Sequence, residues 1–318
     1  MRYSLIIPVG PGRKVEVKDS IARLDYPKGA FEVIIEEGKN PSKNRNKAIK
    51  RSKGEIMLLL DDEAIFEKDL LDKADNFFKA YHGYDILGGP QLTPKTDEFF
   101  AKLSGIALAS GFGTFKISNR YKRGDINFNA TEFDITSANC FVKREVFEKI
   151  GYFHPFLYPA EEREFFSRAQ AAGFKIAKSS DVVIYHKRRK DLWSFARQIF
   201  KYGITRPQKE IIVQEKPHIE LEFILVALFS IYMSFLPMLL VLYKPAAVPA
   251  LCYLAFIIFG GIVESAKNKS PAGAIVFPLI FFVIHFSYGW GLIRGFIKAL
   301  YLYRNKRRKQ LQSTNHEQ

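Results

Sequence analysis

Three consecutive acidic residues, Asp61, Asp62 and Glu63, follow a run that is apolar at every position, Ile56–Leu60. Such a run predicts a strand buried on both faces, and ligands of open α/β sheets bind beyond the carboxyl ends of the strands. Carboxylate oxygens are the ligands that Mg²⁺ and Mn²⁺ prefer. Asp61 and Glu63 are therefore a candidate clamp for a divalent cation. The alternative is a group of acids that only caps a helix.

The elements around this triplet alternate between short β-rich runs and helical patterns, which is typical of a parallel α/β sheet. The predicted strands are Tyr3–Ile7, Phe31–Ile35, Glu55–Leu60, Asp85–Leu87 and Phe133–Val142. The predicted helices are Lys14–Leu24, Pro41–Ser52, Glu67–Tyr81 and Asp97–Ala109. In the second helix, Asn40 or Ser42 can cap the N-terminus and Pro41 suits the first turn.

Composition points to a membrane rather than to nucleic acid. The 318 residues carry a formal charge of +15, and Lys and Arg cluster beside long apolar runs, where anionic lipid headgroups attract them. Two cysteines, Cys140 and Cys252, cannot form a disulfide framework, which indicates a reducing compartment. The first apolar run, Leu5–Ile7, is too short for a signal peptide. We therefore expect the soluble part to lie in the cytoplasm.

Two segments of the central part leave alternatives open. Residues 111–132 are rich in Gly, Asn, Lys and Arg, and form either a mobile loop near the site or a solvated insertion. Between Asp191 and Ile204, apolar residues recur at helical spacing after the basic run Lys187–Lys190. This pattern favours a helix lying on the membrane surface over an ordinary packed helix.

Three apolar segments, 223–243, 246–263 and 274–297, each approach the roughly 20 residues that a membrane-spanning helix needs. A cytoplasmic start and three crossings would put the basic tail, 301–318, outside, whereas basic clusters prefer the cytoplasm. One segment is then a hairpin, or the charge rule is violated. The candidate break points are Pro237, Pro278, Gly289, Gly291 and Gly295.

Over most of Arg2–Arg206 the motifs resemble glycosyltransferase family 2, the large inverting family with the GT-A fold. The segments that carry the resemblance are Leu5–Val9, Phe31–Gly38, Asn40–Asn46, Leu59–Glu63, Ile135–Asn139, Pro159–Arg168 and Ala172–Ile176. The resemblance implies an α/β domain with a doubly wound, Rossmann-like mixed sheet, followed by an α-helical transmembrane region. The expected divisions are a GT-A domain at 1–190, an amphipathic helix and linker at 191–217, the transmembrane region at 218–300 and the tail.

The resemblance also implies a nucleotide-sugar donor, with a UDP- or a GDP-sugar equally open. Pro8 ends the strand that borders the base in the family, and Glu36 or Glu37 takes the place of a base-contacting aspartate. Arg45 and Asn46 resemble an Arg-Asn pair near the nucleotide, where a guanidinium offers forked donors to phosphate. Exposed strand-end charge is the alternative for Glu36 and Glu37, and ordinary helix surface is the alternative for Asn46.

Asp61 and Glu63 occupy the two named places of the family's Asp-x-Asp motif, with Glu in place of the second Asp. We expect them to hold Mg²⁺ or Mn²⁺ on the donor diphosphate, with Asp62 and His186 assisting, although a lone histidine is more often structural. The turn that holds Ser137 and Asn139 resembles a Gly-Ala-Asn turn against the donor sugar, with Ser137 in place of Gly. A strand-end turn without a ligand is the alternative.

Glu162 takes the position of the aspartate that serves as general base in the family. Glu161 and Glu162 cannot both point at the acceptor, because neighbours on a helix diverge by roughly 100°. The alternative is a pair of acids favourably placed at a helix N-terminus, which would leave the spacing to Arg168 and Gly173 unexplained.

We therefore predict a multi-pass protein of the cell membrane that transfers a sugar, with inversion, to a lipid-linked saccharide or another membrane-associated acceptor, without nucleic acid. The processive Gln-x-x-Arg-Trp motif of the family is absent from Ser194–Phe200, which favours single addition. Two alternatives remain. One is direct transfer to a polyprenyl phosphate such as dolichyl or undecaprenyl phosphate, and the other is a catalytically silent membrane scaffold.

Overall fold

The computed structural model describes residues 1–157, 161–212 and 221–314, with 208–212 and 305–314 described for the backbone only. The expected linker at 213–217, Pro159 and Ala160 of the acidic motif, and the last four residues of the basic tail lie outside the described residues. The chain forms two compact units, Met1–Arg188 and Arg189–Gln318, and each is considered by itself.

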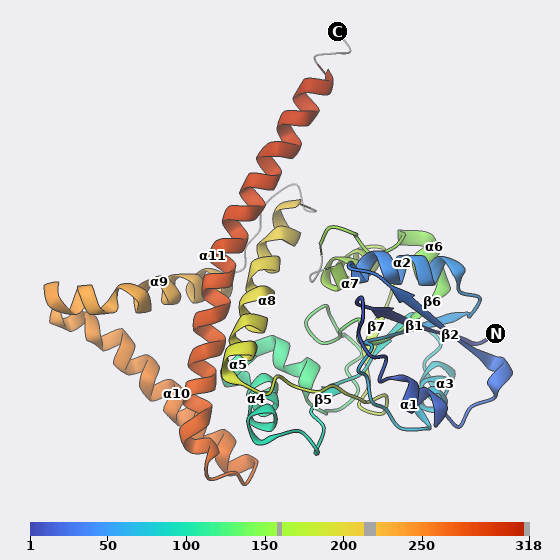
Figure 1. The fold of residues 1–318 in the computed structure, drawn as a ribbon, viewed down its shortest axis with the longest axis horizontal. Coiled ribbons are helices and arrows are strands. Elements are labelled where there is room, and N and C mark those ends of the chain that lie inside the picture. The colour runs from blue at the N-terminus through green and yellow to red at the C-terminus, as the bar shows by residue number, and fades with distance from the viewer. Residues whose placement is uncertain (158–160, 213–220, 315–318) are drawn as a thin grey trace. The chain divides into compact units, whose positions relative to one another are not determined.

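A six-stranded mixed sheet forms the centre of the first unit (Figure 1). Its order is β2-β1-β3-β6-β4-β7, and β6 runs antiparallel to both of its neighbours. The strands are β1 (Tyr3–Val9), β2 (Phe31–Glu37), β3 (Ile56–Leu60), β4 (Ile86–Gly88), β6 (Asn139–Lys143) and β7 (Ile176–Lys178), and a separate parallel pair is formed by β5 (Gln91–Leu92) and β8 (Ile184–Tyr185). The predicted mixed α/β sheet is thus confirmed.

The helices of this unit are α1 (Lys18–Ala22), η1 (Lys28–Ala30), α2 (Pro41–Arg51), α3 (Leu70–Ala80), α4 (Phe99–Ala109), α5 (Gly111–Thr114), η2 (Phe115–Tyr121), α6 (Arg144–Ile150) and α7 (Glu161–Ala171). Helix α3 packs on one face of the sheet, and α2, α6 and α7 pack on the other. Of the two predicted caps for α2, Asn40 is the one used. Its side chain accepts a hydrogen bond from the Lys43 backbone N–H, and Pro41 opens the helix.

Strand β3 shows why the sheet needs cover on both faces. Leu58 and Leu60 belong to a core cluster with residues of α3, whereas Met57 and Leu59 belong to a second cluster with residues of α2, α6 and α7. All five residues of β3 are buried. The strand is therefore fixed in position by packing on two sides, and the residues that follow it start from a rigid point.

Three predicted boundaries were wrong. The strand expected from Phe133 begins only at Asn139, because residues 131–134 form a turn in which Asp134 accepts hydrogen bonds from Thr131. The helix expected over 14–24 is limited to α1. The segment 111–132 contains α5 and η2 rather than only loop, and Ser110 caps α5 by accepting a hydrogen bond from Phe112 N–H.

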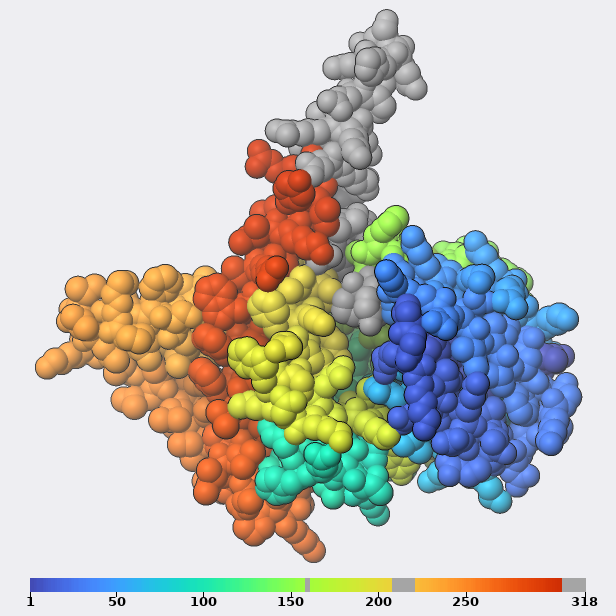
Figure 2. All heavy atoms as spheres, viewed as in Figure 1, coloured from blue at the N-terminus to red at the C-terminus, as the bar shows by residue number. Residues whose placement is uncertain are grey.

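The second unit is helical. Its elements are α8 (Leu192–Ile212), α9 (Leu221–Leu242), η3 (Lys244–Ala246), α10 (Ala247–Lys267) and α11 (Gly273–Thr314). Within the described part of the chain, three helical segments are long and apolar enough to cross a membrane: Leu221–Leu242, Lys244–Lys267 and Gly273–Arg304. Large apolar side chains such as Leu228 and Phe259 are exposed along α9 and α10, the orange surface in Figure 2.

The suggested break points do not interrupt the helices. Helix α9 continues through Pro237 and α11 continues through Pro278, Gly289, Gly291 and Gly295. The glycines instead allow close packing, as small residues do between membrane helices. A Cβ on Gly291 would lie 2.9 Å from the Cα of Gly203 on α8, and a Cβ on Gly289 would lie 2.4 Å from the carbonyl oxygen of Val226 on α9.

The amphipathic segment 191–204 is helical, as predicted, and forms the first part of α8. Helix α8 runs beside α11 (Figure 1) and buries Phe195 and Ile199, while Trp193 is exposed with the Arg197 guanidinium over its ring. Its position on a membrane surface stays a prediction.

We expect Gly203→Ala to destabilise the second unit. Alanine is ordinarily better than glycine inside a helix by about 1 kcal/mol. The new Cβ would however lie 2.3 Å from the carbonyl oxygen of Tyr288, and overpacking costs about 1–3 kcal/mol. The apparent Tm of the full chain in detergent should fall by a few degrees, about 3–6 °C. Gly124→Ala, where no atom lies within 4 Å of the new Cβ, is the control. Equal Tm values for both variants would contradict the close packing of α8 on α11.

Candidate active site

The acidic triplet lies where three chain segments meet. Asp61 directly follows β3, and β6 pairs antiparallel with β3 so that Asn139 faces Leu60. Residues just before β6 therefore reach the same edge of the sheet as residues just after β3. Ile65 and Tyr185 exchange backbone hydrogen bonds of 3.0 and 2.7 Å, which brings His186 to this edge as well. The three segments are far apart in sequence, and backbone pairing alone brings them together.

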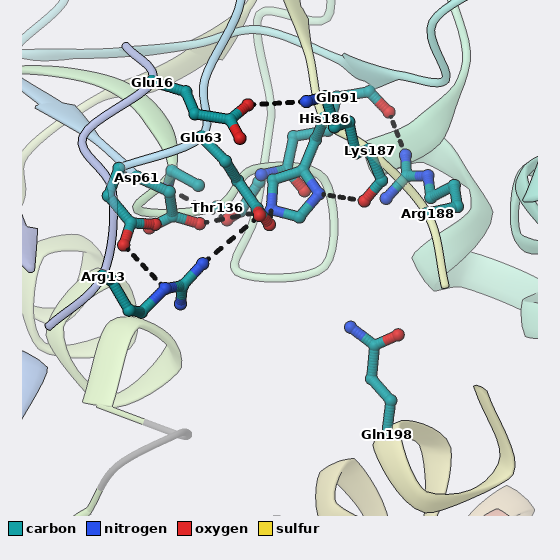
Figure 3. Close-up of polar contacts among 12 residues, drawn as sticks. Arg13, Glu16, Asp61, Glu63, Gln91, Thr136, His186, Lys187, Arg188 and Gln198 are labelled. Carbon is teal, nitrogen blue, oxygen red and sulfur yellow. Dashed lines mark hydrogen bonds and ion pairs between the residues drawn. The ribbon is translucent and has the colours of Figure 1, made fainter. Parts of the chain in front are cut away.

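Each carboxylate of the triplet faces a guanidinium or an imidazole group, and Figure 3 shows Arg13 and His186 beside Glu63. The Nε2 atom of His186 lies 3.1 Å from Glu63 and 3.6 Å from Asp61. The Arg13 guanidinium lies 2.9 Å from Asp62 and 3.3 Å from Glu63. Arg45 reaches Asp61 at 3.1 Å. The structure thus brings together all four residues predicted to bind or assist a metal, and adds Arg13 to them.

The surroundings shift the pKa values of Asp61 and Asp62 in opposite directions. Burial acts to raise the pKa of Asp61, but the hydrogen bond from His186 and the Arg45 charge outweigh it, so this pKa lies below its usual value. Burial also raises the pKa of Asp62, and here the Arg13 charge does not compensate because Asp61 and Glu63 add repulsion. Asp61 is therefore the member of the pair whose ionised form the site favours.

The donor set suits a divalent cation in chemistry, since the His186 imidazole lies within 3.6 Å of two carboxylates, those of Asp61 and Glu63. As the side chains stand, no three His, Cys, Asp or Glu residues in the described ranges are arranged to hold a metal ion. The carboxylate oxygens of the triplet instead contact Arg13, Arg45 and His186.

Arg45 joins the triplet to the helix that carries the second acidic pair. Its guanidinium donates to Asp61 Oδ1 at 3.1 Å and to Glu161 Oε1 at 2.8 Å, and the residue is only 4% exposed. Burial raises the pKa of Glu161 to about 7, although the Arg45 charge acts against it. Arg45 was predicted as a nucleotide contact, and in this structure it contacts these two acids, so a nucleotide-binding role stays a prediction.

Glu162 occupies a different environment from its neighbour. Arg120 from η2 pairs with Oε1 at 2.7 Å, and the backbone N–H and hydroxyl of Ser137 donate to Oε2 at 2.8 and 2.9 Å. Burial acts to raise the pKa of Glu162, but the Arg120 charge and the Ser137 hydrogen bonds outweigh it and hold the pKa below its usual value. Ser137, predicted to lie against the donor sugar, thus supports the predicted base.

Several other predicted donor-binding residues have structural partners. Asn139 is fully buried and donates to the carbonyl oxygens of Pro90 and Val182. Asn46 exchanges hydrogen bonds with the backbone of Phe153. Glu36 is buried in β2 and pairs with Lys47 and Arg51 of α2. These contacts explain the residue types without a ligand, and a donor-binding role for them stays a prediction.

Two predicted residues lie at the carboxyl ends of the first strands. Pro8 is buried in β1 opposite Glu36, and Glu37 at the end of β2 is exposed. Glu37 accepts a hydrogen bond of 3.3 Å from Gly12 N–H, which ties β2 to the loop after β1. Of the two acids proposed for the base contact, Glu37 is therefore the accessible one.

Sequence reasoning missed three residues of the site. Arg13 comes from a loop and Arg120 from the short helix η2, and only the enrichment of Arg and Lys in 111–132 hinted at Arg120. Glu161 was set aside in favour of Glu162, yet it is the buried partner of Arg45. Two acids at the start of a helix and an acid at the end of a buried strand need a positive charge if they lie close together. This pattern could have suggested a basic side chain, here Arg45, between them.

Comparison with known proteins supports the same family that the motifs resemble. Residues 1–203 match the sequence model of a family described as Glycosyltransferase like family 2. A curated relative, the poly(ribitol-phosphate) beta-N-acetylglucosaminyltransferase TarS of Staphylococcus aureus, is 29% identical over 117 residues, which cover 27% of this chain and 20% of the relative. The match thus spans about a fifth of that protein's length.

Two solved structures align with most of this chain. The mannosyltransferase PcManGT from Pyrobaculum calidifontis, solved with GDP-Man and Mn²⁺, is 16% identical with a TM-score of 0.55, covering 94% of this chain and 87% of that one. S. aureus TarS 1–349, solved with UDP-GlcNAc, is 16% identical with a TM-score of 0.45, covering 92% and 90%. At these identities the first likeness shows the fold alone. The match over residues 1–203 decides the family, and this chain therefore belongs to glycosyltransferase-like family 2.

Proposed function

We propose that the chain transfers a sugar from a nucleotide-diphosphate sugar to a membrane-associated hydroxyl acceptor by one direct displacement, with inversion. The observation that carries the proposal is the Glu162 carboxylate. Arg120 and Ser137 hold it in its ionised form, and it lies one residue from the Glu161–Arg45–Asp61 chain of contacts that begins at the triplet. The proposed base, Glu162, and the proposed metal ligand, Asp61, are thereby connected through Glu161 and Arg45.

On the donor side, Asp61 and Glu63 would hold the cation, with His186 and Asp62 assisting. A divalent cation at this position supplies charge neutralisation for the departing nucleoside diphosphate. PcManGT, solved with GDP-Man and Mn²⁺, and TarS, solved with UDP-GlcNAc, make the two nucleotide classes reasonable donors to test.

On the acceptor side, Glu162 would accept the proton of the attacking hydroxyl. The acceptor oxygen forms a bond to the anomeric carbon as the bond from that carbon to the diphosphate oxygen breaks, and the proton passes to the Glu162 carboxylate. Each carboxylate oxygen can accept two hydrogen bonds, so the contacts with Arg120 and Ser137 leave capacity for the acceptor.

Glu161 is a weaker candidate for the base, although its pKa of about 7 is nearer to neutral pH. Its side chain is 3% exposed and faces Arg45, whereas that of Glu162 is 15% exposed. A base must reach the proton that it removes before its pKa matters. Glu161 therefore acts by positioning Arg45 rather than by touching the acceptor.

The helices that can cross a membrane favour an acceptor that lies at the membrane, either a lipid-linked saccharide or another membrane-bound hydroxyl. A carboxylate held in its ionised form is needed for a hydroxyl acceptor. It is needed less for a polyprenyl phosphate, which is already ionised. Glu162 is the reason for preferring the hydroxyl.

The function is tested with the full chain in membranes, Mn²⁺, membrane lipid extract and a panel of UDP- and GDP-sugars carrying radiolabelled sugar. We expect label from one donor to enter the lipid phase and EDTA to abolish the transfer. Equal transfer to a soluble sugar without lipid would contradict the membrane acceptor, and activity unchanged by EDTA would contradict the metal.

We expect Glu162→Gln to reduce the transfer rate by about 10²- to 10⁴-fold, the usual contribution of a general base, while donor binding measured by calorimetry is kept. Glu162→Asp, which keeps the carboxylate, should recover part of the rate. The control is Glu148→Gln, an exposed carboxylate on α6. Near wild-type transfer by Glu162→Gln would refute the base, and a prenyl-phosphate product formed by Glu162→Ala would favour the polyprenyl-phosphate reaction.

The raised pKa of Glu161 predicts a dependence of stability on pH. Its value in the folded protein is about 7 instead of 4.5, so the folded state binds the proton more tightly than the unfolded state. The stability gained from this proton is full below about pH 4.5 and is lost as pH rises through 7, a change of up to about 3 kcal/mol. Glu161→Gln lacks this loss.

The apparent Tm of wild type relative to Glu161→Gln should therefore fall between pH 5 and pH 8, measured in one detergent at fixed ionic strength. Glu148→Gln should run parallel to wild type over the same range. Parallel curves for Glu161→Gln as well would show that Glu161 titrates at its ordinary value.

A further inference from the structure

Arg13 is held over the acidic triplet by a built turn. Gly10, Pro11, Gly12 and Arg13 form a β-turn in which Arg13 N–H donates to the Gly10 carbonyl oxygen at 3.1 Å and Gly12 has a φ of +70°. Proline second and glycine third are the residues that a type II turn favours. The absence of a side chain at Gly10 also matters, because a Cβ there would lie 3.1 Å from the Arg13 Cδ.

Backbone contacts fix this loop on both sides of Arg13. Gly12 N–H donates to Glu37 at the end of β2, and Val17 N–H donates to the carbonyl oxygen of Asp62 at 2.9 Å. The guanidinium thus starts from a fixed point beside the triplet. Its side chain is 56% exposed, so it can change direction without opening a cavity in the core.

The partners of Arg13 are acids on which a bound cation would act. Asp62, 2.9 Å away, has a side chain that is only 6% exposed, and Glu63, 3.3 Å away, is one of the two proposed metal ligands (Figure 3). A divalent cation shared by Asp61 and Glu63 would compete with Arg13 for Glu63 and would repel the guanidinium. A nucleoside diphosphate brings new negative charge to the same place, and a guanidinium offers it forked donors.

We propose that the Arg13 guanidinium leaves its ion pair with Glu63 when the cation binds and pairs instead with the diphosphate of the donor. This change of partner couples metal binding to donor binding. This inference rests on the proposed function and deepens it. Arg13 weakens the binding of the cation alone and strengthens the binding of the nucleoside diphosphate. Because binding free energies are linked, each of the two ligands then raises the affinity for the other.

The test measures binding on the full chain in detergent, not activity. Mn²⁺ affinity without nucleotide is measured from the electron paramagnetic resonance signal of free Mn²⁺. The affinity for UDP and for GDP at saturating Mn²⁺ is measured by calorimetry. The variants are Arg13→Gln, Arg13→Lys and, as the matched control, Lys14→Gln, which removes the neighbouring exposed charge of the same loop.

We expect Arg13→Gln to tighten Mn²⁺ binding about tenfold and to weaken binding of the preferred diphosphate about tenfold, a change of opposite sign in the two assays. Lys14→Gln should stay within about twofold of wild type in both, as expected for an exposed charge without an ion pair at the site. Arg13→Lys keeps the charge and should leave Mn²⁺ binding near wild type, which serves as the check on folding.

The inference is refuted if Arg13→Gln binds Mn²⁺ and the diphosphate as Lys14→Gln does, or if it binds Mn²⁺ more weakly than wild type. The proposed function still stands in that case, provided that wild type binds Mn²⁺ and transfers sugar. Absence of Mn²⁺ binding by every variant overturns both the inference and the metal in the proposed function. Tighter Mn²⁺ binding with unchanged diphosphate binding also refutes the transfer of Arg13 to the donor.

Discussion

The Arg45 guanidinium bridges the two acidic groups on which the site depends. It contacts Asp61, where the chain leaves a rigid strand, and Glu161, where helix α7 begins, and it is almost completely buried. Removing one partner of a buried ion pair costs about 3–5 kcal/mol, because the remaining charge is left uncompensated. The bridge therefore fixes the separation between the triplet and Glu162. An Arg45 that moved would shift the donor and acceptor sides of the site together.

Charge balance explains why so many acids can lie in one place. Asp61, Asp62, Glu63 and Glu161 face the guanidinium groups of Arg13 and Arg45, and the His186 imidazole lies beside Asp61 and Glu63. The two guanidinium groups differ in exposure, since the side chain of Arg45 is 5% exposed and that of Arg13 is 56% exposed. The buried cation gives the site its shape, and the exposed one is available for exchange with a ligand. Glu63 fits this division, because its extra methylene lets one carboxylate reach both Arg13 and His186.

Sequence patterns predicted the parts of this structure that depend on local chemistry. The all-apolar run of β3 identified a strand buried on two faces, and Asn40 and Pro41 identified the start of α2. The triplet was found because three acids follow an all-apolar strand, whereas the α7 acids were found from the resemblance to a family motif. The three apolar helices followed from composition alone.

What the sequence could not supply was long-range pairing. Whether Ser137 would contact Glu162 depends on the antiparallel register of β6 on β3, and the position of His186 depends on a bridge between Ile65 and Tyr185. Arg120 reaches Glu162 from a segment whose composition indicated only a loop, because short helical turns such as η2 have no periodic signal. A glycine run in an apolar helix is equally ambiguous. The same residues that suggest a break also permit close packing, and only the facing carbonyl groups of α8 and α9 decide between them.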